Sequence, residues 1–508
     1  MADARVELDP ANPLAAVDER MFGSFVEHMG RAIYGGIYEP GHPTSDAAGW
    51  RHDVIDLVRE LGVTIVRYPG GNFVSGYDWE DGVGPRDRRP TRVDMAWRSI
   101  EPNLVGTDDF VEWARLARVA PMLAVNLGTR GSEAARNLVE YCNGPAGTRY
   151  GDLRIGNGQP TPHDVRTWCL GNEMDGPWQI GHKSAGEYGA LAAHAGRAMR
   201  EVDPTIELVV CGSSGSQMPT FGAWEETVLD LAWDVADYVS VHAYYDPDSF
   251  SSVDAYLACS RDLDRTIDAV AAIADSVGRR RGSPKRIDLS VDEWNVWRLR
   301  AHQATESSTA SFRHAPPLAE DRQDVADALA VGCLLITLLR HADRVRIACL
   351  AQLVNVIPAI RTVDGGPAWR QTTSYPFADV AHFGRGVVLR SWVESPTYAA
   401  DAEGEVDAVE LVAVHDPIVD RLTIFAVNRV ARPITLEAAL TRLPTLAVID
   451  HRVLTDVDLT AANTADQPHR VGPVQGSGAR VDHDRLLVTL PARSWNVIRL
   501  AGQAPPTA

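Results

Sequence analysis

The chain has 508 residues, more than the roughly 250–300 residues at which a single hydrophobic core stops growing, so the sequence predicts at least two domains. Hydrophobic residues make up 45% and charged residues 23%, values that exclude a wholly disordered, collagen-like or membrane-embedded chain. The net charge of −19, from 49 basic and 68 acidic residues, disfavours binding to nucleic acid or to an anionic membrane surface.

The sequence shows no sign of a signal peptide, a membrane-spanning segment or a disulfide framework. The first ten residues lack the basic segment and apolar stretch of a signal peptide. The longest apolar run, residues 329–339, is too short to cross a bilayer and predicts a buried helix. Six widely spaced cysteines without a Cys-x-x-Cys pair are typical of reduced, packed thiols. We therefore expect a cytoplasmic protein with no membrane partner.

Short apolar, β-branched runs alternate with helical periodicity through the first three quarters of the chain. The predicted strands are residues 21–26, 64–68, 121–127, 167–171, 207–211, 238–242, 287–291 and 347–353. Helical periodicity occupies residues 53–61, 108–118, 185–201, 253–277 and 321–341, between or after these strands. Eight strands with intervening helices predict an α/β fold, a (β/α)8 TIM barrel over residues 15–385.

After residue 386 the helical periodicity fades and short alternating runs follow. Strands are predicted at residues 387–393, 406–415, 422–428, 446–454, 485–490 and 494–500. Frequent turn residues between them predict a second, all-β domain over residues 386–502, an antiparallel sandwich of the jelly-roll kind. Residues 5–8, within the segment 1–14, are predicted to add a strand to it.

Polar residues that end apolar barrel strands are the candidates for chemistry, because barrel active sites lie at the C-terminal ends of the strands. The fourth predicted strand runs into Asn172 and Glu173, the sixth into His242 and Tyr244, and the seventh into Glu293. Two carboxylates from separate strands at one barrel mouth are the minimum equipment for acid/base chemistry plus nucleophilic attack on a glycosidic bond.

Two further acids near this mouth are predicted to be structural. Asp175 follows Glu173 by two residues, and Asp292 directly precedes Glu293. Strand alternation turns Asp292 away from the side that Glu293 faces.

The sequence also bears on four other classes of protein: metal-dependent hydrolases, nucleotide-cofactor enzymes, nucleic-acid-binding proteins and non-catalytic carbohydrate-binding proteins. A metal-dependent barrel hydrolase needs a His-x-His or His/carboxylate set at the strand ends, and Glu27, His28 and His242 do not supply one, so no metal is predicted. The absence of a Gly-x-Gly-x-x-Gly turn and of a P-loop argues against a nucleotide cofactor. The basic residues 279–281 and 285–286 precede a strand and are predicted to form a solvated turn away from the site. A non-catalytic carbohydrate-binding protein stays open, although it does not need two facing glutamates.

Longer motifs narrow the possibilities. Residues 23–40, 67–77, 168–182 and 349–357, which include Arg-Tyr-Pro-Gly-Gly-Asn at 67–72 and Cys-Leu-Gly-Asn-Glu at 169–173, resemble the intracellular bacterial α-L-arabinofuranosidases of glycoside hydrolase family 51. The resemblance extends from about residue 14 to residue 500. It implies hydrolysis of arabinofuranosyl oligosaccharides without a cofactor. Another retaining glycosidase, such as a β-xylosidase or an endoglucanase, is the nearest alternative.

The resemblance also implies roles for individual residues. Glu173 would be the general acid/base and Glu293 the nucleophile of a retaining mechanism, with carboxyl groups about 5–5.5 Å apart. Arg67 and Tyr244 would stabilise the ionised Glu293. The implied sugar-binding residues are Glu27, Asn72, Asn172, Tyr244 and Gln352.

Aromatic residues are expected to complete the cleft. Trp97, Trp178 and Trp297 lie in loops on the predicted active-site side, where their rings could stack on sugar faces. The polar loop at residues 298–317 is expected to shape the leaving-group side. The resemblance further implies a homohexamer.

Overall fold

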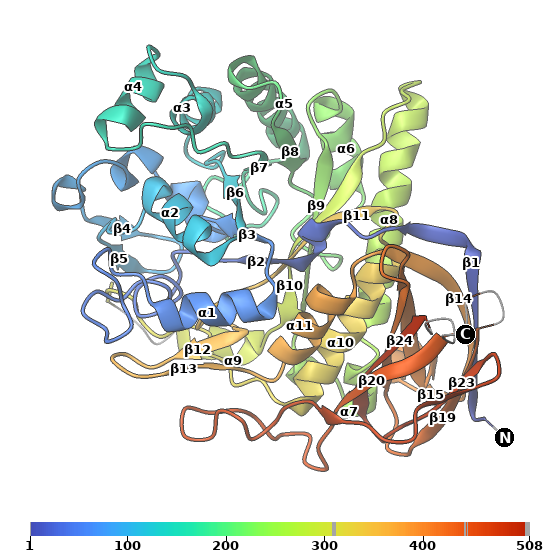
Figure 1. Ribbon diagram of the computed structural model, residues 1–508. Helices are drawn as coiled ribbons and strands as arrows, with labels where there is room; N and C mark the ends of the chain where they lie inside the picture. Colours follow the sequence, from blue (N-terminus) through green and yellow to red (C-terminus); the bar gives the residue numbers. More distant parts are fainter. Residues whose placement is uncertain (1, 307–310, 441–442, 444–445, 503–508) are drawn as a thin grey trace, which may run out of the picture.

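The structure, a computed structural model, describes residues 2–306, 311–440, 443 and 446–502. A closed barrel wrapped by helices forms one body, and a curled sheet built mostly from the C-terminal quarter of the chain packs against its side (Figure 1). The fold class predicted from the sequence is thereby confirmed. The domain bounds at residues 15–385 and 386–502 stay a prediction.

The barrel contains all eight predicted strands, closed in the order β10-β11-β2-β3-β6-β7-β8-β9 with every neighbouring pair parallel. All eight C-terminal ends therefore meet at one mouth. The strands are β2 (Gly23–Phe25), β3 (Ile65–Tyr68), β6 (Ala120–Ala124), β7 (Thr167–Leu170), β8 (Glu207–Val210), β9 (Tyr238–Tyr245), β10 (Asp288–Val296) and β11 (Val345–Leu350).

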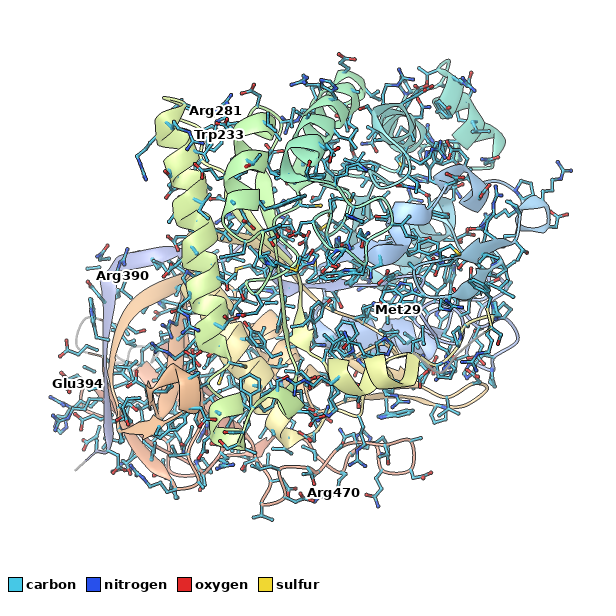
Figure 2. The ribbon with its side chains drawn as sticks, turned by 180° about the vertical axis from the view of Figure 1, so that it is seen from behind. Met29, Trp233, Arg281, Arg390, Glu394 and Arg470 are labelled. Carbon is cyan, nitrogen blue, oxygen red and sulfur yellow. The ribbon has the colours of Figure 1, made fainter. Side chains whose placement is uncertain are left out.

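Helices surround the barrel. They are α1 (His52–Leu61), α2 (Thr107–Ala117), α3 (Ser132–Asn143), α4 (Arg149–Gly156), α5 (Ala185–Val202), α6 (Ala223–Ala232), α7 (Val253–Tyr256), α8 (Ser260–Arg280), α9 (Leu299–Glu306), α10 (Val325–Arg340) and α11 (Ser374–Phe383). The segment predicted as one helix at 253–277 is divided into α7 and α8. The basic run 279–281, predicted as a turn, instead ends α8: Arg279 and Arg280 are its last residues and Arg281 follows it. Arg280 and Arg281 pair with acids in and just after α6, and Figure 2 shows Arg281 far from Met29, which follows β2 at the barrel mouth.

The all-β part is one ten-stranded sheet in the order β21-β20-β24-β18-β17-β14-β1-β19-β23-β22, and it curls until β20 contacts β22. The strand β1, although first in the chain, pairs antiparallel with β14 and parallel with β19. The strands are β1 (Ala4–Ala16), β14 (Val387–Glu394), β17 (Val409–Asp416), β18 (Arg421–Asn428), β19 (Ile434–Ala439), β20 (Leu446–Leu454), β21 (Val474–Gln475), β22 (Arg480–Asp482), β23 (Arg485–Leu490) and β24 (Ser494–Gly502).

Three two-stranded hairpins complete the described secondary structure. They are β4 (Arg92–Asp94) with β5 (Ser99–Glu101), β12 (Ile360–Thr362) with β13 (Ala368–Arg370), and β15 (Thr397–Ala399) with β16 (Glu405–Asp407). Among the described helices, none combines the length and apolar character needed to span a bilayer.

The helix α10 joins the two bodies. It contacts β10, β11 and α8 of the barrel on one side and β17, β18 and β24 of the sheet on the other. A helix covered on both sides must be apolar around its whole circumference, which explains the run at residues 329–339. Gly332 lies where α10 meets β24, and a Cβ atom there would approach Trp495 Cε3 to 2.7 Å. The close contact between helix and sheet therefore requires the missing side chain.

We predict that Gly332→Ala lowers the midpoint of thermal unfolding, because relieving the clash with the Trp495 ring costs about 1–3 kcal/mol and outweighs the gain of about 0.5–1 kcal/mol from replacing a helical glycine. Gly186→Ala in α5 is the matched control, since a Cβ atom there meets nothing within 4 Å. The control variant should be at least as stable as the wild type. Equal midpoints for the two variants would contradict the tight α10–β24 contact.

Candidate active site

A cavity of about 800 Å³ lies at the C-terminal ends of the barrel strands. The structure brings the predicted site residues together here. Those that line the cavity are Glu27, Asn72, Trp97, Glu173, Trp178, Tyr244, Glu293 and Gln352. The other two, Arg67 and Asn172, lie almost fully buried and hydrogen-bond to each other over 2.7 Å. The segment predicted as a loop at 298–317 begins with the helix α9, whose residues Leu299, His302 and Gln303 also line the cavity. Residues 307–310 of that segment lie outside the described residues.

Glu293 has a carboxylate group that two side chains hold by hydrogen bonds. It lies on β10, and its Oε1 accepts a hydrogen bond from Arg67 Nη1 at 2.7 Å. Its Oε2 accepts one from the Tyr244 hydroxyl, also at 2.7 Å. Hydrogen bonds from a guanidinium and a phenol favour the charged form of a carboxylate and fix its orientation. These two hydrogen bonds hold the Glu293 carboxylate in one orientation at the cavity wall.

The neighbouring Asp292 corrects an expectation. Strand alternation predicted that it faces away from Glu293, yet its carboxylate lies 3.7 Å from Arg67 Nε and 3.3 Å from His242 Nε2. The pairing of β10 with β9 shifts register between Ser290 and Glu293, and such an irregularity breaks the two-residue alternation. Burial opposes the charge on Asp292, but Arg67 and His242 hold its pKa below the ordinary value.

Glu173 is held differently, in the turn after β7. Its φ angle of +44° lies in the left-handed region that non-glycine residues rarely adopt. The carboxylate accepts hydrogen bonds from Trp178 Nε1 and pairs with His242 Nδ1, both at 2.9 Å. Burial raises the pKa of Glu173, the charge of Glu293 adds to this effect, and the hydrogen bonds from His242 and Trp178 only partly oppose it. Glu173 therefore keeps its proton to a higher pH than an ordinary glutamate does.

His242 was recognised at a strand end from the sequence but was given no role in the site. The pairing of β9 with β10 places His242 beside Glu293. The His242 ring also contacts the carboxylates of Glu173 and Asp292. Burial alone would lower the pKa of His242, but the carboxylates of Glu293, Asp292 and Glu173 raise it to about 10. Its position at a strand end was the available signal. Only the fold reveals that three carboxylates surround it.

The two glutamates lie close together. Glu173, Glu293 and His242 each contribute one side-chain atom to a group whose members are all within 4.8 Å of one another. Retaining glycosidases have carboxyl groups about 5–5.5 Å apart, whereas inverting enzymes need about 6.5–9.5 Å to admit a water molecule. The same three residues could in principle ligate a metal ion. The Arg67 guanidinium 2.7 Å from Glu293 would repel such an ion, so this donor set fits a hydrogen-bonded carboxylate pair better.

Glu27 and Gln352 form a second polar group in the cavity. The Glu27 carboxylate accepts hydrogen bonds from Trp97 Nε1 at 2.8 Å and from the backbone N–H of Phe73 at 2.9 Å. Gln352 bonds to Glu27 through both its amide oxygen and its amide nitrogen. Burial raises the pKa of Glu27 to about 8, helped by the charge of Glu293. A Cβ atom at Gly71 would lie 2.6 Å from Glu27 Oε2, so the glycine lets the loop approach this carboxyl group.

Asp175 fixes the loop between β8 and α6. Its buried carboxylate accepts hydrogen bonds from Ser213 Oγ at 2.6 Å, from Ser214 N at 2.9 Å and from Thr220 Oγ1 at 2.5 Å. Residues 214–218 of this loop line the cavity. Asp175 therefore anchors one cavity wall to the turn that carries Glu173.

Comparisons with known proteins agree with this geometry. The α-L-arabinofuranosidase 1 domain matches residues 57–261, and the α-L-arabinofuranosidase C-terminal domain matches residues 292–494. The chain is 52% identical to the intracellular exo-α-(1→5)-L-arabinofuranosidase of Streptomyces lividans, across 99% of this chain and 76% of that protein. It is 50% identical to the enzyme of the same name from Halalkalibacterium halodurans, across 98% and 99% of the two chains.

A solved structure extends this similarity to three dimensions. A family 51 α-L-arabinofuranosidase from Bifidobacterium longum superposes with a TM-score of 0.94 and 46% identity, over 98% of this chain and 99% of that one. The chain therefore belongs to the α-L-arabinofuranosidases of glycoside hydrolase family 51.

Proposed function

We propose that this protein is an exo-acting, retaining α-L-arabinofuranosidase, in which Glu293 is the nucleophile and Glu173 the general acid/base. It removes terminal non-reducing α-L-arabinofuranosyl residues from arabinose-containing oligosaccharides. The observation that carries the proposal is a pair of buried carboxyl groups within 4.8 Å of each other, of which one is paired with a guanidinium and the other has a raised pKa.

The first step breaks the glycosidic bond. Glu293 attacks the anomeric carbon, while Glu173 transfers its proton to the glycosidic oxygen as the C–O bond breaks. Arg67 and Tyr244 hold Glu293 in place through hydrogen bonds of 2.7 Å. The product is a covalent arabinosyl ester on Glu293 and a released alcohol.

The second step reverses the roles of the acid and base. Ester formation removes the charge of Glu293, so one cause of the raised pKa of Glu173 disappears. The ionised Glu173 then takes a proton from a water molecule that attacks the anomeric carbon. The ester bond breaks, and the released arabinose keeps the α configuration.

Recognition of the sugar depends on the polar groups around the pair. Asn72, Asn172, Glu27 and Gln352 offer amide and carboxyl groups to the hydroxyls of one arabinofuranosyl residue. A buried site built to pair hydroxyl groups rejects sugars that lack or misplace one. Asn172, oriented by Arg67, is placed beside the acid/base to bond the 2-hydroxyl group, a contact that strengthens in glycosidase transition states.

The alternatives are less well supported. A non-catalytic carbohydrate-binding protein has no need for a carboxylate pair held by Arg67 and His242. A β-xylosidase or endoglucanase shares two glutamates, but the relatives reported above are named exo-α-(1→5)-L-arabinofuranosidases. Their names also support a cytoplasmic location and α-(1→5)-linked arabino-oligosaccharides as the substrate to assay first.

Activity assays on an aryl α-L-arabinofuranoside test the proposed roles. Glu293→Ala should lose activity by more than about 10⁴-fold, because it removes the nucleophile, and Glu173→Ala should lose about 10²–10⁴-fold. Azide should restore turnover in the Glu173→Ala variant and yield α-configured arabinosyl azide. Glu226→Ala, an exposed position on α6, is the control and should retain wild-type activity. A wild type without arabinofuranosidase activity would refute the substrate, and full activity in either site variant would refute its role.

The pH dependence of kcat/KM tests the role of His242. Its hydrogen bond and charge lower the pKa of Glu173, so in His242→Asn the acid/base keeps its proton to a higher pH. The alkaline limb of the profile should therefore move upward in pH. His382→Asn, on α11 and outside the cavity, should leave the profile unchanged. An alkaline limb that moves downward in His242→Asn would contradict the proposed effect of His242 on the pKa of Glu173.

The assembly is a separate proposal. We propose a homohexamer, as the family resemblance implies, with neutral arabinofuranosyl oligosaccharides as the substrate partners. Multi-angle light scattering on the purified protein should give a molar mass six times that of the chain. A monomeric mass at micromolar concentration would contradict the proposal.

A further inference from the structure

The cavity extends well beyond the catalytic pair. Its volume of about 800 Å³ lies in the range of pockets that bury a drug-sized ligand, which is larger than one pentofuranosyl residue. Its lining also includes Ser216, Tyr245, Phe250, Asp262 and Glu403, which are separate from the residues that hold the catalytic pair. Of these, Glu403 comes from the C-terminal all-β part of the chain rather than from a barrel loop.

We propose that this part of the cavity is a subsite for the leaving-group side of a neutral oligosaccharide, and that Glu403 with its partner Arg265 determines the preference for longer chains. The inference rests on the proposed function and adds to it a specificity device supplied by the β15–β16 hairpin.

The hairpin is fixed on the barrel rather than left in solvent. Ala400 and Val406 pack with Ala258 in a small buried cluster, and the Tyr398 hydroxyl donates a hydrogen bond to the backbone oxygen of Asp254 at 3.1 Å. Asp401 pairs with the Ser251 hydroxyl. The turn between β15 and β16, residues Asp401–Glu403, contacts α7. The all-β part thus contributes a defined wall to the cavity.

Glu403 is held by the helix α8. Arg265 Nη1 and Nη2 donate hydrogen bonds to its two carboxylate oxygens at 2.5 and 2.8 Å, and the carboxylate is only 18% exposed. These hydrogen bonds lower the pKa of Glu403, so it remains an acceptor at neutral pH. Each carboxylate oxygen keeps a free lone pair, and the half-exposed Arg265 keeps free N–H groups. A carboxylate beside a guanidinium can therefore accept from one sugar hydroxyl and donate to the next.

The groups around this pair suit a sugar as well. Asp262, on the same helix, accepts hydrogen bonds from the Tyr245 hydroxyl at 3.1 Å and from Ser216 Oγ at 3.4 Å. Phe250 lines the cavity nearby and offers an aromatic face. Trp297 lines it too, and its buried indole N–H has no hydrogen-bond partner within the described part of the chain. That donor is available to a ligand hydroxyl group.

The occupant follows from the position of the subsite. The catalytic pair binds the terminal arabinofuranosyl residue, so whatever extends farther along the cavity belongs to the leaving group. Arg265 pairs with both Glu403 and Asp262, and Arg261 Nε lies 3.8 Å from Glu403 Oε2. Two carboxylates and two guanidiniums leave no strong preference for a charged ligand. A neutral sugar chain, rich in hydroxyl groups, is the matching chemistry.

The test compares two substrates in the same enzyme. We would measure kcat/KM for α-(1→5)-linked arabinotriose and for an aryl α-L-arabinofuranoside, which has no second sugar, and take the ratio of the first to the second. In Glu403→Gln this ratio should fall about tenfold, the effect of losing a hydrogen bond to a charged group. Arg265→Gln removes the partner from a helix outside the hairpin and should lower the ratio in the same direction.

Glu405→Gln is the matched control. Glu405 is exposed on the same hairpin and does not line the cavity, so this variant changes the charge equally and should keep the wild-type ratio. An unchanged ratio in both Glu403→Gln and Arg265→Gln, or an equal fall in Glu405→Gln, would overturn the inference. If the proposed function itself were wrong, the wild type would cleave neither substrate, which distinguishes the two failures.

Discussion

The buried guanidinium of Arg67 is the interaction on which the site depends. It is 1% exposed, it projects from β3, and it contacts Glu293 and Asp292 on β10 and Asn172 after β7. Burying a cation is costly unless several good hydrogen bonds compensate it. The planar, five-donor fork of arginine can make these bonds to separate partners at once, which a lysine ammonium cannot do in the same geometry. Arg67 on β3 thus holds together groups that two other strands, β7 and β10, deliver.

The proposed mechanism requires Glu173 to start protonated beside an ionised Glu293, and the charges around Arg67 suit this arrangement. Within the described part of the chain, the carboxylates of Glu173, Asp292 and Glu293 pair with two cations, Arg67 and His242. One proton on the carboxylates balances the group, and Glu173 is the carboxyl group whose pKa is raised. When Glu293 becomes an ester, two carboxylates and two cations remain, so Glu173 can ionise without leaving an excess of negative charge. In the proposed mechanism, the negative and positive charges of this group are therefore balanced both before the first step and after the ester has formed.

Much of the barrel could be predicted because its strands are buried on both faces and read as continuous apolar runs. Glu173 and Glu293 could be predicted as neighbours because parallel strands place their C-terminal ends at one mouth. The arrangement of Asp292 could not, since the irregular pairing at Ser290–Glu293 is invisible in a pattern that assumes strict alternation. The strand β19 was missed because its alternation, Ile434–Ala439, is short and follows the turn residues 430–433 closely.

Contacts between distant parts of the chain set the limit of sequence reasoning. Glu403 and Arg265 are 138 positions apart. No sequence pattern around either residue predicts that the β15–β16 hairpin contacts α8. The same holds for Gly332 and Trp495, which require each other only because α10 lies between barrel and sheet. Such pairs depend on how two separately patterned bodies dock, and periodicity describes each body alone.

The covalent intermediate is the most direct test of this account. A 2-deoxy-2-fluoro-α-L-arabinofuranoside with an activated aryl leaving group should slow the second step more than the first, so that the ester accumulates. Mass spectrometry of the intact protein followed by peptide mapping would locate the added mass. We predict one fluoroarabinosyl group for each chain, attached to Glu293. Attachment to Glu173, or complete hydrolysis of the reagent with no adduct and an inverted product, would contradict it.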